Sequence, residues 1–561
     1  MRCLATLLAF IVVQPVVSVQ AQWQPNGRPL ALTTTVTVPQ DVIYDGVDGV
    51  IVAWTDLRDG EVYVFAQRLS SAGARLWGDE GVTVCSAIND KYWPHLVSDG
   101  TGGAIVSWGD WRDAQSSVDV YAQRIDSAGQ PVWIENGIAI CNAIEDQGFF
   151  QLGVVTDGAG GAIVVWDDKR SACGLCSVAD VYAQRIDAGG ALVWAQNGLG
   201  VCETGLAQDI AVAADGKGGA IIVWSELRDL VQLDIYAQRV STDGQLCWLA
   251  NGVSVSSAAG GQSLPAIASD GNGSAIIVWR DERNPLVTSV YAQRVSPTGN
   301  REWLSDGVGT GAYLGNGGPV VTSSLDGGVI AAWEDFRLGF VTKVYAGMID
   351  STGVMAWDPG GVPVGYGLSF QRKPAICSDG FGGAVVSWTE DTNIHAQRFT
   401  QFGLRPWPES GLPFCLAIGE QEHSLVACLA DGSAVGVWQD LRVGEENIYA
   451  ARIGRWGQTL AGIQDDRDTP AIEVLGLYPN PFSETVHFEV RVPGRREALV
   501  AIFDVRGRQV RHFALPEGHG GIGRFTFDGR DDSGRALPTG LYLCRVDAGD
   551  RSVVRKIVLV R

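Results

Sequence analysis

The sequence predicts an all-β protein in which an eight-bladed β-propeller is followed by a small β-sandwich. Three observations predict this fold: a phrase of the type DGxGGAIVVWxDxR that recurs eight times, short apolar stretches bounded by Gly, Asp and Asn, and no sustained helical period. A fixed period of this length is typical of repeat architectures. The tryptophans that close the phrases are spaced by 50 to 58 residues. They are Trp54, Trp108, Trp166, Trp224, Trp279, Trp333, Trp388 and Trp438.

The N-terminus has the features of a secretory signal peptide. A charged start precedes an apolar run from Leu4 to Val19, and a small-x-small site ends at Ala21. We therefore expect residues 1–21 to be removed by cleavage after Ala21. A membrane anchor is the alternative, but Pro15 interrupts the run and leaves it short for a span of about 20 residues. No later stretch is long and apolar enough to predict an integral membrane segment.

The composition predicts a folded chain and disfavours two classes of partner. Apolar residues make up 46% of the chain, which is enough for packed cores. The net charge of -21 disfavours nucleic acid, because nucleic-acid-binding proteins need a basic stripe. The same charge disfavours an anionic membrane surface. It supports solubility and identifies no partner.

Each repeat unit divides into four short apolar stretches, which we predict to be strands. Examples are 133–141, 373–378, 162–168 and 120–126, and the second type ends at an Asp-Gly pair that predicts a hairpin. The third stretch is apolar at consecutive positions, so it should be covered on both faces. In a four-stranded antiparallel sheet, this means that another sheet packs against each face.

The ends of the repeat array favour a closed ring over an open stack of sheets. Seven units carry a WxxNG-type tryptophan after the YAQR strand, whereas in the eighth unit that position falls on Ala461. The missing strand is found instead at Trp23 to Leu32. An N-terminal strand that completes the last sheet leaves no terminal sheet exposed. We therefore predict that residues 22–461 form an eight-bladed propeller closed by its first strand.

An acid stands two places after each phrase tryptophan, and an arginine follows four places after it in seven units. The acids could form a ring at one channel mouth that holds a cation or an anionic glycan. Alternatively, each acid pairs with an arginine of its own or the next blade and has a structural role, which we favour because a residue needed in every blade usually serves the blade. The eight acids are Asp56, Asp110, Asp168, Glu226, Asp281, Asp335, Glu390 and Asp440.

Function on a repeat scaffold is expected where the pattern breaks, which directs attention to units three, six and seven. Unit three has a longer loop with Cys173 and Cys176, which we interpret as a loop disulfide or inert pair in preference to a redox pair or half of a zinc site. In units six and seven, Met348 and Thr392 replace pattern arginines, and His395 replaces a tyrosine. Cysteines at the ends of apolar runs are expected to be buried.

The sequence contains no recognisable catalytic or cofactor-binding signature. Histidines at metal-ligand spacing, a GxSxG elbow and a GxxxxGK[ST] loop are all missing. No catalytic residue, metal ligand or cofactor is therefore predicted. Calcium has no support either, because the Asp-Gly-x-Gly-Gly turns lack the alternating acids of a calcium loop. A pair of glycosidase-like carboxylates remains open, since acids are plentiful.

The period stops after Ala461, and residues 462–472 are predicted to be a polar linker. Short strand signals continue through residues 473–561. The motifs LYPNPF (477–482), FDVRGRQV (503–510), FDGRD (527–531), PTGLY (538–542) and KIV (556–558) follow in order. The segment resembles the Ig-like module related to the flagellar hook-capping protein and to the C-terminal sorting domain of type IX (Por) secretion. It departs from that module at Phe527, where the module usually has Trp.

The resemblance implies an Ig-like fold and contact with an outer-membrane secretion machinery, which would leave the protein secreted or on the outer surface of a Gram-negative-type bacterium. Our first hypothesis is a non-enzymatic binding or scaffold protein whose propeller loops contact an unidentified protein or glycan. The alternative is an extracellular carbohydrate-active hydrolase or lyase with acids at the channel mouth. A third hypothesis is a structural surface-layer component. An enzyme should show two or three unpaired acids with an aromatic residue in one cleft.

Overall fold

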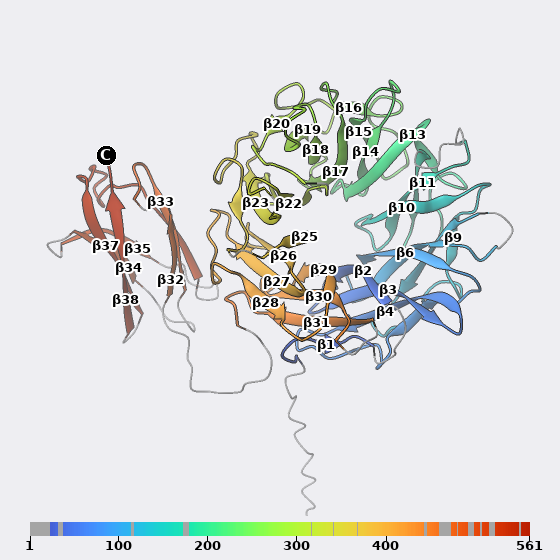
Figure 1. Ribbon diagram of the computed structural model, residues 1–561, viewed down its shortest axis with the longest axis horizontal. Helices are drawn as coiled ribbons and strands as arrows, with labels where there is room; N and C mark the ends of the chain where they lie inside the picture. Colours follow the sequence, from blue (N-terminus) through green and yellow to red (C-terminus); the bar gives the residue numbers. More distant parts are fainter. Residues whose placement is uncertain are drawn as a thin grey trace, which may run out of the picture.

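The computed structural model describes most of the chain as β-strands joined by turns, and it contains no helix in the described part (Figure 1). The all-β prediction is therefore confirmed. The predicted signal peptide, the predicted linker and the Cys173 to Cys176 loop lie outside the described residues. The described ranges are 23–31, 37–113, 117–171, 179–315, 317–339, 341–366, 369–442, 446–458, 473–478, 481–491, 499–504, 508–514, 522–548 and 551–561.

The first four repeat units form blades 1 to 4 of a ring. Blade 1 contains β2 (Thr37–Tyr44), β3 (Val50–Arg58), β4 (Glu61–Leu69) and β5 (Val82–Cys85). Blade 2 contains β6 (Lys91–Ser98), β7 (Ala104–Asp110), β8 (Asp119–Ile125) and β9 (Ile138–Cys141). Blade 3 contains β10 (Gln147–Thr156), β11 (Ala162–Asp168), β12 (Ala179–Ile186) and the start of β13 (Leu199–Ala214). Blade 4 contains the end of β13, β14 (Ala220–Glu226), β15 (Asp234–Val240) and β16 (Val253–Ser256).

The next four units form blades 5 to 8. Blade 5 contains β17 (Gln262–Ser269), β18 (Ala275–Asp281), β19 (Ser289–Val295) and β20 (Val308–Gly309). Blade 6 contains β21 (Val320–Ser323), β22 (Val329–Asp335), β23 (Lys343–Ile349) and β24 (Val362–Pro363). Blade 7 contains β25 (Gln371–Ser378), β26 (Ala384–Glu390), β27 (Asn393–Phe399) and β28 (Leu412–Cys415). Blade 8 contains β29 (Gln421–Cys428), β30 (Ala434–Asp440), β31 (Asn447–Ile453) and β1 (Arg28–Pro29).

The second strand of each blade is buried on both faces, because neighbouring blades pack against it. In blade 3, Trp166 packs in a cluster with Val120 of blade 2, while Val165 packs in a cluster with Trp224 of blade 4. Successive side chains of one strand point to opposite faces, so a continuously apolar strand fills two interfaces. The consecutive apolar pattern of the phrase is explained by this position between two sheets.

The N-terminal segment closes the ring, as predicted. In β1, Arg28 and Pro29 pair antiparallel with Ala450 and Tyr449 of β31, which completes the four-stranded sheet of blade 8. Just before β1, Gly27 adopts a φ of +85°, and a Cβ there would lie 2.4 Å from the Trp438 ring. Only glycine fits this position without displacing the phrase tryptophan of blade 8.

A disulfide joins the inner strands of the last two blades. Cys377 of β25 and Cys428 of β29 are bonded, with 51 residues of sequence separation. By contrast, Cys85, Cys141, Cys202 and Cys415 are free and buried, and burial raises the pKa of Cys85 and Cys141 to about 11. These four cysteines occupy the apolar positions that the sequence predicted for them.

We expect Cys377→Ser to lower the free energy of unfolding by about 4 kcal/mol, because it releases a loop of this length in the unfolded chain. Urea unfolding with and without dithiothreitol measures the loss. The wild type in dithiothreitol should approach the variant. Replacement of the exposed free Cys247 by Ser is the matched control and should change neither curve. An unchanged midpoint for Cys377→Ser would contradict a stabilising role of this bond.

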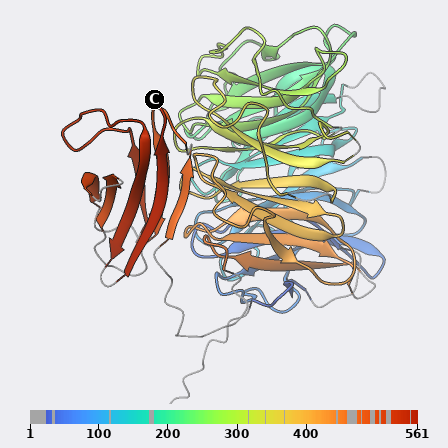
Figure 2. The same ribbon diagram turned by 60° about the vertical axis from the view of Figure 1, so that its left-hand side comes forward.

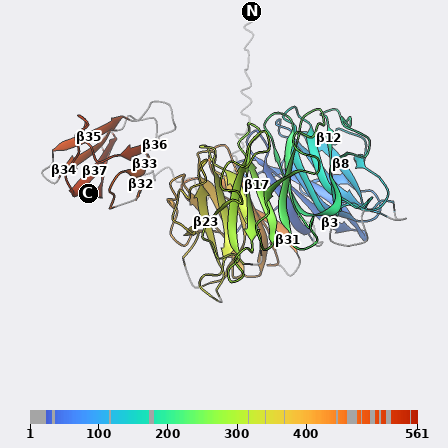
Figure 3. The same cartoon turned by 90° about the horizontal axis from the view of Figure 1, so that it is seen from above.

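The C-terminal strands form a separate sandwich of two sheets. One sheet has the order β32 (Glu473–Tyr478), β33 (Val486–Arg491), β36 (Ile522–Phe527). The other has the order β35 (Gln509–Ala514), β34 (Leu499–Asp504), β37 (Gly540–Ala548), β38 (Arg551–Leu559). Aromatic residues such as Phe482, Phe488 and Phe527 fill the core between the sheets. Figure 3 shows this sandwich beside the propeller.

Candidate functional site

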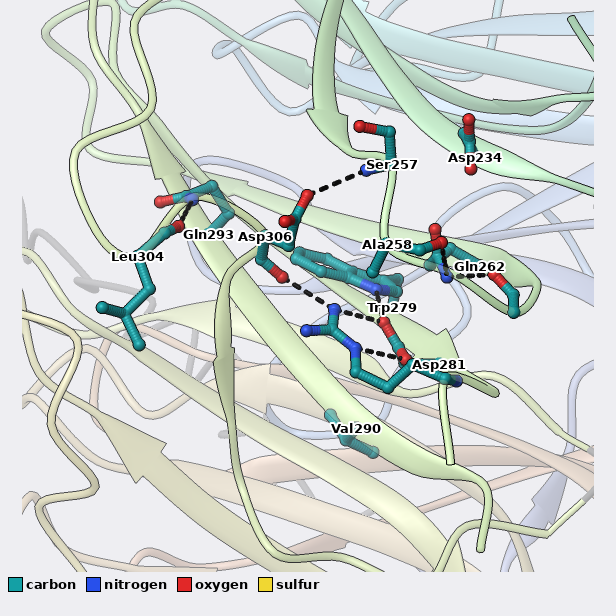
Figure 4. A network of polar contacts seen from close by, with 12 residues as sticks. Asp234, Ser257, Ala258, Gln262, Trp279, Asp281, Val290, Gln293, Leu304 and Asp306 are labelled. Carbon is teal, nitrogen blue, oxygen red and sulfur yellow. Dashed lines mark hydrogen bonds and ion pairs between the residues drawn. The ribbon is translucent and has the colours of Figure 1, made fainter. Parts of the chain in front are cut away.

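The repeated acids are held inside their blades by a clamp of four side chains. In blade 5, Trp279 Nε1 donates to Asp281 Oδ2 at 2.9 Å, and Arg283 donates Nε and Nη2 to the two oxygens of the same carboxylate (Figure 4). The Arg283 guanidinium lies 3.7 Å from the ring centroid of Tyr291, and its Nη2 also donates to the backbone oxygen of Asp306. A fully desolvated carboxylate is stable here because each oxygen accepts a charge-assisted hydrogen bond.

The same clamp recurs around the ring with two exceptions. In blade 1, Trp54 Nε1 has no partner, although Asp56 pairs with Arg58 at 2.8 Å. In blade 7, Thr392 replaces the arginine, and Glu390 accepts instead from Trp388 and Gln371. The ion pairs of the other six blades are Asp110–Arg112, Asp168–Arg170, Glu226–Arg228, Asp281–Arg283, Asp335–Arg337 and Asp440–Arg442, at 2.5 to 2.7 Å.

In blade 8, the clamp favours the ionised form of its acid, Asp440. Burial alone would raise the pKa of Asp440, but hydrogen bonds from Arg442 and Trp438 outweigh it and lower that pKa below its usual value. Such an acid stays charged and stabilises the fold until the pH falls through its lowered pKa. In the described residues, the seven acids that pair with arginine have no exposed side-chain surface. They are therefore placed to hold the blades together and not to contact a ligand.

A cavity of about 790 Å³ lies in the central channel, lined by the inner strands of the blades. Its lining combines the prolines of several inner strands with a few large polar or aromatic side chains. Blade 1 contributes Gln40 and Asp41, and blade 2 contributes Trp93. Blades 7 and 8 contribute Lys373 and His423. These five residues lie near the starts of the inner strands, at one end of the channel. We call the part of the cavity that they line the channel mouth.

A β-bulge near the start of the inner strand places these side chains at the channel mouth. The register of β6 against β7 shifts between Tyr92 and His95, and equivalent shifts occur in β13, β17, β25 and β29. The residue at each bulge has a positive φ without being glycine. These residues are Trp93 (50°), Asp209 (54°), Leu264 (51°), Lys373 (52°) and His423 (52°).

A bulky residue in the left-handed region costs free energy, about 1 to 3 kcal/mol, and such residues cluster at functional sites. A bulge that served only the fold could carry Gly or Asn, which adopt this conformation at lower cost. Here Trp, Asp, Leu, Lys and His occupy one equivalent position in five blades. Because the side chain differs from blade to blade, we infer that this position has a role in binding and not only in the fold of each blade.

The polar groups of the channel mouth are tied to each other across neighbouring blades. Lys373 Nζ and Arg372 Nη2 lie 2.7 and 3.0 Å from the two oxygens of Glu422. The hydrogen bond from Lys373 is the largest influence on Glu422 and lowers its pKa. On the other side, Asp41 Oδ2 accepts from the backbone N–H of Leu96 at 3.0 Å. At blades 7 and 8, Arg372 and Lys373 therefore carry one positive charge more than Glu422 neutralises.

Of the positions where units six and seven depart from the pattern, none lines this cavity among its described residues. Met348 is buried, pairs with Ile330 inside blade 6 and packs in a cluster with Val386 of blade 7. His395 stacks on Trp388, and its Nδ1 lies 4.0 Å from Glu390. These substitutions adjust packing. Unit three differs from the other units in its longer and irregular inner strand, β10. This strand contacts the channel mouth, because the backbone oxygen of Phe149 accepts a hydrogen bond from Trp93 Nε1 at 3.0 Å.

Within the described part of the chain, no group of three or more His, Cys, Asp or Glu side chains is arranged to hold a metal ion. The described residues also include no helix with the length and apolar character needed to cross a bilayer.

Asp119 of blade 2 is a buried acid outside the clamp, and its titration makes stability depend on pH. Burial and the nearby charges of Asp113 and Asp110 raise the pKa of Asp119 to about 7. The folded state thus binds this proton more readily than the unfolded state, so stability falls as the pH rises toward 7 and levels off above it. Asp119→Asn should raise the melting temperature by a few degrees at pH 8 and much less at pH 5.

Scanning calorimetry at the two pH values measures this difference. Glu135→Gln, at an exposed position of the same blade, is the matched control and should leave both melting temperatures unchanged. An equal effect of Asp119→Asn at pH 5 and pH 8 would contradict the raised pKa.

Comparison with known proteins identifies one domain of this chain. Residues 482–552 match the FlgD Ig-like domain family. No curated protein sequence matches the chain. Among solved structures, a puromycin hydrolase aligns at 16% identity and a TM-score of 0.38, over 73% of this chain and 60% of the hydrolase. The chain therefore spans less than two thirds of that relative.

Two other solved structures are similar at lower scores. An α-L-arabinanase of Penicillium chrysogenum, complexed with arabinobiose, aligns at 13% identity and a TM-score of 0.32, over 65% of this chain and 93% of the arabinanase. PorZ of Porphyromonas gingivalis, a surface component of the type IX secretion system, aligns at 11% identity and a TM-score of 0.21, over 93% and 81% of the two chains. At these scores, the similarities carry no argument about activity. The chain thus combines a β-propeller with a C-terminal FlgD Ig-like domain.

Proposed function

We propose that this chain is an extracellular binding protein whose channel mouth holds a polymeric carbohydrate. One observation carries the proposal: at the bulge of the inner strand, five blades place five different bulky or charged side chains in the left-handed conformation. The Trp, acidic and Arg side chains that recur in the repeat bind one another inside the blades. Three of these five residues, Trp93, Lys373 and His423, line the cavity instead, which is where a concave ligand site is expected.

The chemistry of the mouth favours a saccharide that carries acidic groups. Trp93 is 48% exposed, so its flat ring is available to stack on the C–H face of a sugar. Lys373 lines the cavity from blade 7, and Lys373 and Arg372 together carry one positive charge more than their partner Glu422, so a carboxylate or sulfate of the sugar would find a cation there. Burial lowers the pKa of His423, which therefore contributes a neutral imidazole from blade 8. Gln40 adds an amide that can bond with hydroxyl groups.

Binding is favoured over hydrolysis because of the acids at the mouth. Glycoside hydrolysis usually requires two carboxyl groups on either side of the scissile bond. Among the described residues that line the cavity, Asp41 is the one acid, and it accepts the backbone N–H groups of Val42 and Leu96. The neighbouring acids Asp209 and Glu422 are engaged by Ser225 and by Lys373. We therefore propose a non-enzymatic role, with hydrolysis or lyase activity as the outcome that would overturn it.

We propose further that the two ends of the chain deliver the propeller to the cell exterior. Residues 1–21 would act as the signal peptide, and the Ig-like domain would engage the type IX secretion machinery. The match to the FlgD Ig-like family supports the domain type that this role needs. Deletion of residues 473–561 should then retain the propeller inside the outer membrane, as measured by cell fractionation. Export of the truncated chain at the wild-type level would contradict this role.

Incubation of the mature chain with a panel of neutral, uronate-containing and sulfated polysaccharides tests the binding proposal. Affinity electrophoresis with and without calcium detects binding, and reducing-end and unsaturated-uronate assays detect cleavage. We expect retardation by at least one acidic polysaccharide, no dependence on calcium and no new chain ends. Failure to bind any member, or turnover of one, would overturn the proposal.

Trp93→Asn separates a functional bulge residue from a structural one. Asn adopts the left-handed conformation at lower cost than Trp, and the exposed Trp93 ring contributes little burial. We expect the melting temperature to stay constant or rise, with a gain of up to about 1 kcal/mol, while polysaccharide binding is lost. Calorimetry and affinity electrophoresis on the same preparation measure both. A large loss of stability would assign Trp93 to the fold.

A further inference from the structure

The turns of blade 7 differ from their counterparts in other blades at the end of the sheet opposite the channel mouth. Phe381 follows the Asp-Gly pair after β25, and Phe402 lies in the turn after β27. Because β25 and β27 run away from the mouth, both turns lie at the far end of blade 7. The residues equivalent to Phe381 are exposed and mostly small or polar: Val47, Thr101, Ala159, Lys217 and Asn272. In blades 1 to 6 the residues equivalent to Phe402 are also exposed, whereas blade 8 carries the partly buried Trp456 there. The six exposed residues are Ala72, Ala128, Gly189, Asp243, Thr298 and Thr352.

Both phenylalanines are partly buried, and both contact the Ig-like domain. The Phe402 ring stacks on His487 of β33, with centroids 4.5 Å apart and planes 6° from parallel. Arg524 of β36 donates Nη2 to the backbone oxygen of Phe381 at 2.5 Å. Figure 2 shows the C-terminal domain lying against this part of the propeller. The two aromatic residues break the repeat pattern at the two turns that this domain covers.

The interior of blade 7 also differs beneath these turns. The arginine of the YAQR strand pairs with the Asp of the Asp-Gly turn in most blades, and its side chain is usually 11 to 20% exposed. In blade 7 the corresponding Arg398 has no exposed surface, and its guanidinium lies 5.5 Å from the Trp456 ring. Arg455 lies over Phe381 at 3.5 Å. Arginine side chains thus stack on aromatic rings beneath the turns that contact the Ig-like domain.

We infer that Phe381 and Phe402 form a dedicated docking patch for the chain's own Ig-like domain, which holds this domain at the end of blade 7 remote from the channel mouth. An attachment or export machinery that grips the Ig-like domain therefore leaves the mouth unobstructed and facing away from it. The inference that the channel mouth stays accessible to its ligand rests on the proposed binding function. The docking of the Ig-like domain does not depend on that function.

Small-angle X-ray scattering of the full mature chain tests the docking. The test variant is Phe381→Ala with Phe402→Ala, because blades 3 and 2 already carry Ala159 and Ala128 at the equivalent turns and fold with them. Thr352→Ala, at the same turn of blade 6, is the matched control. Loss of both aromatic contacts should weaken docking about tenfold or more. The maximum dimension of the test variant should then increase by up to about 20 Å, as residues 459–472 allow.

We expect the wild type and Thr352→Ala to scatter as the docked arrangement and the test variant to require separated domains. The inference is overturned if wild-type scattering already requires independent domains, or if the test variant scatters as the wild type does. Polysaccharide binding by the test variant should remain at the wild-type level, because the patch lies away from the mouth. A failure of docking is thereby distinguished from a failure of the proposed binding function.

Discussion

Trp23→Ala should lower the free energy of unfolding by about 3 to 5 kcal/mol, which is the cost of removing a large buried aromatic side chain. Trp23 is 4% exposed and packs with Leu30 and Trp54 where blade 8 meets blade 1. Its Nε1 donates to the backbone oxygen of Ser71 at 2.8 Å. The equivalent tryptophan of blade 2, Trp133, bonds with Ala188 of blade 3 in the same way.

The loss at Trp23 should exceed that of an ordinary core substitution because this segment closes the ring. Asn26 accepts Arg442 Nη2 at its backbone oxygen and the N–H of Leu416 at its side chain. In other blades the equivalent contacts come from the same repeat; Arg283 of blade 5, for example, donates to the backbone oxygen of Asp306. In blade 8 the N-terminal segment makes these contacts instead. Release of this segment leaves a blade with three strands and an open edge, which favours association between molecules.

Urea unfolding followed by circular dichroism measures the Trp23→Ala effect. Gln24→Ala, at the exposed neighbouring position, is the matched control and should change stability by less than about 0.5 kcal/mol. A Trp23→Ala loss as small as that of the control would contradict the role of the segment in closure.

Asp281→Ala should cost a comparable 3 to 5 kcal/mol, about the loss seen when one partner of a buried ion pair is removed. The substitution leaves Arg283 without its carboxylate and Trp279 Nε1 without its acceptor. Trp279 is fully buried and the Arg283 side chain is 23% exposed, so water cannot replace the lost partner fully.

The adjacent Glu282 provides a matched control for Asp281. Its pair with Arg280 is as short, at 2.6 Å, but the Glu282 side chain is 46% exposed. Glu282→Ala should therefore cost no more than about 1 kcal/mol. Thermal unfolding of the two variants measures the difference. If the two variants lost equal stability, the burial of Asp281 and its three hydrogen-bond donors would contribute nothing to the stability of the protein.

Much of the fold was predictable because one sequence pattern is repeated eight times. A continuously apolar strand has one explanation in an antiparallel sheet, namely burial between two sheets, and the structure confirms it for β11, which contains Trp166. The displaced strand was also visible, because the WxxNG position falls on Ala461 at one end and on Trp23 at the other. Closure follows from this displacement and needs no contact information.

The channel mouth was less predictable because its geometry depends on register. Trp93, Lys373 and His423 look unrelated in the sequence, and only the bulges show that they occupy one equivalent position. Loss of the repeated arginines drew attention to units six and seven, yet Met348 and His395 serve packing. The available signal was a variable residue between a repeated Gln two places before it and a Pro directly after it, as at position 373 in the QRKPAI stretch and position 264 in QSLPAI.

Titration calorimetry with an acidic polysaccharide, comparing the wild type with a Trp93→Asn, Lys373→Asn and His423→Asn triple variant, most directly tests whether the channel mouth is the functional site. Lys217→Asn, in an exposed turn at the opposite end of blade 4, is the control. We expect the wild type and the control to bind with equal affinity and the folded triple variant to lose at least a hundredfold in affinity, as expected when several central contacts are removed together. Unchanged binding by the triple variant would contradict the assignment.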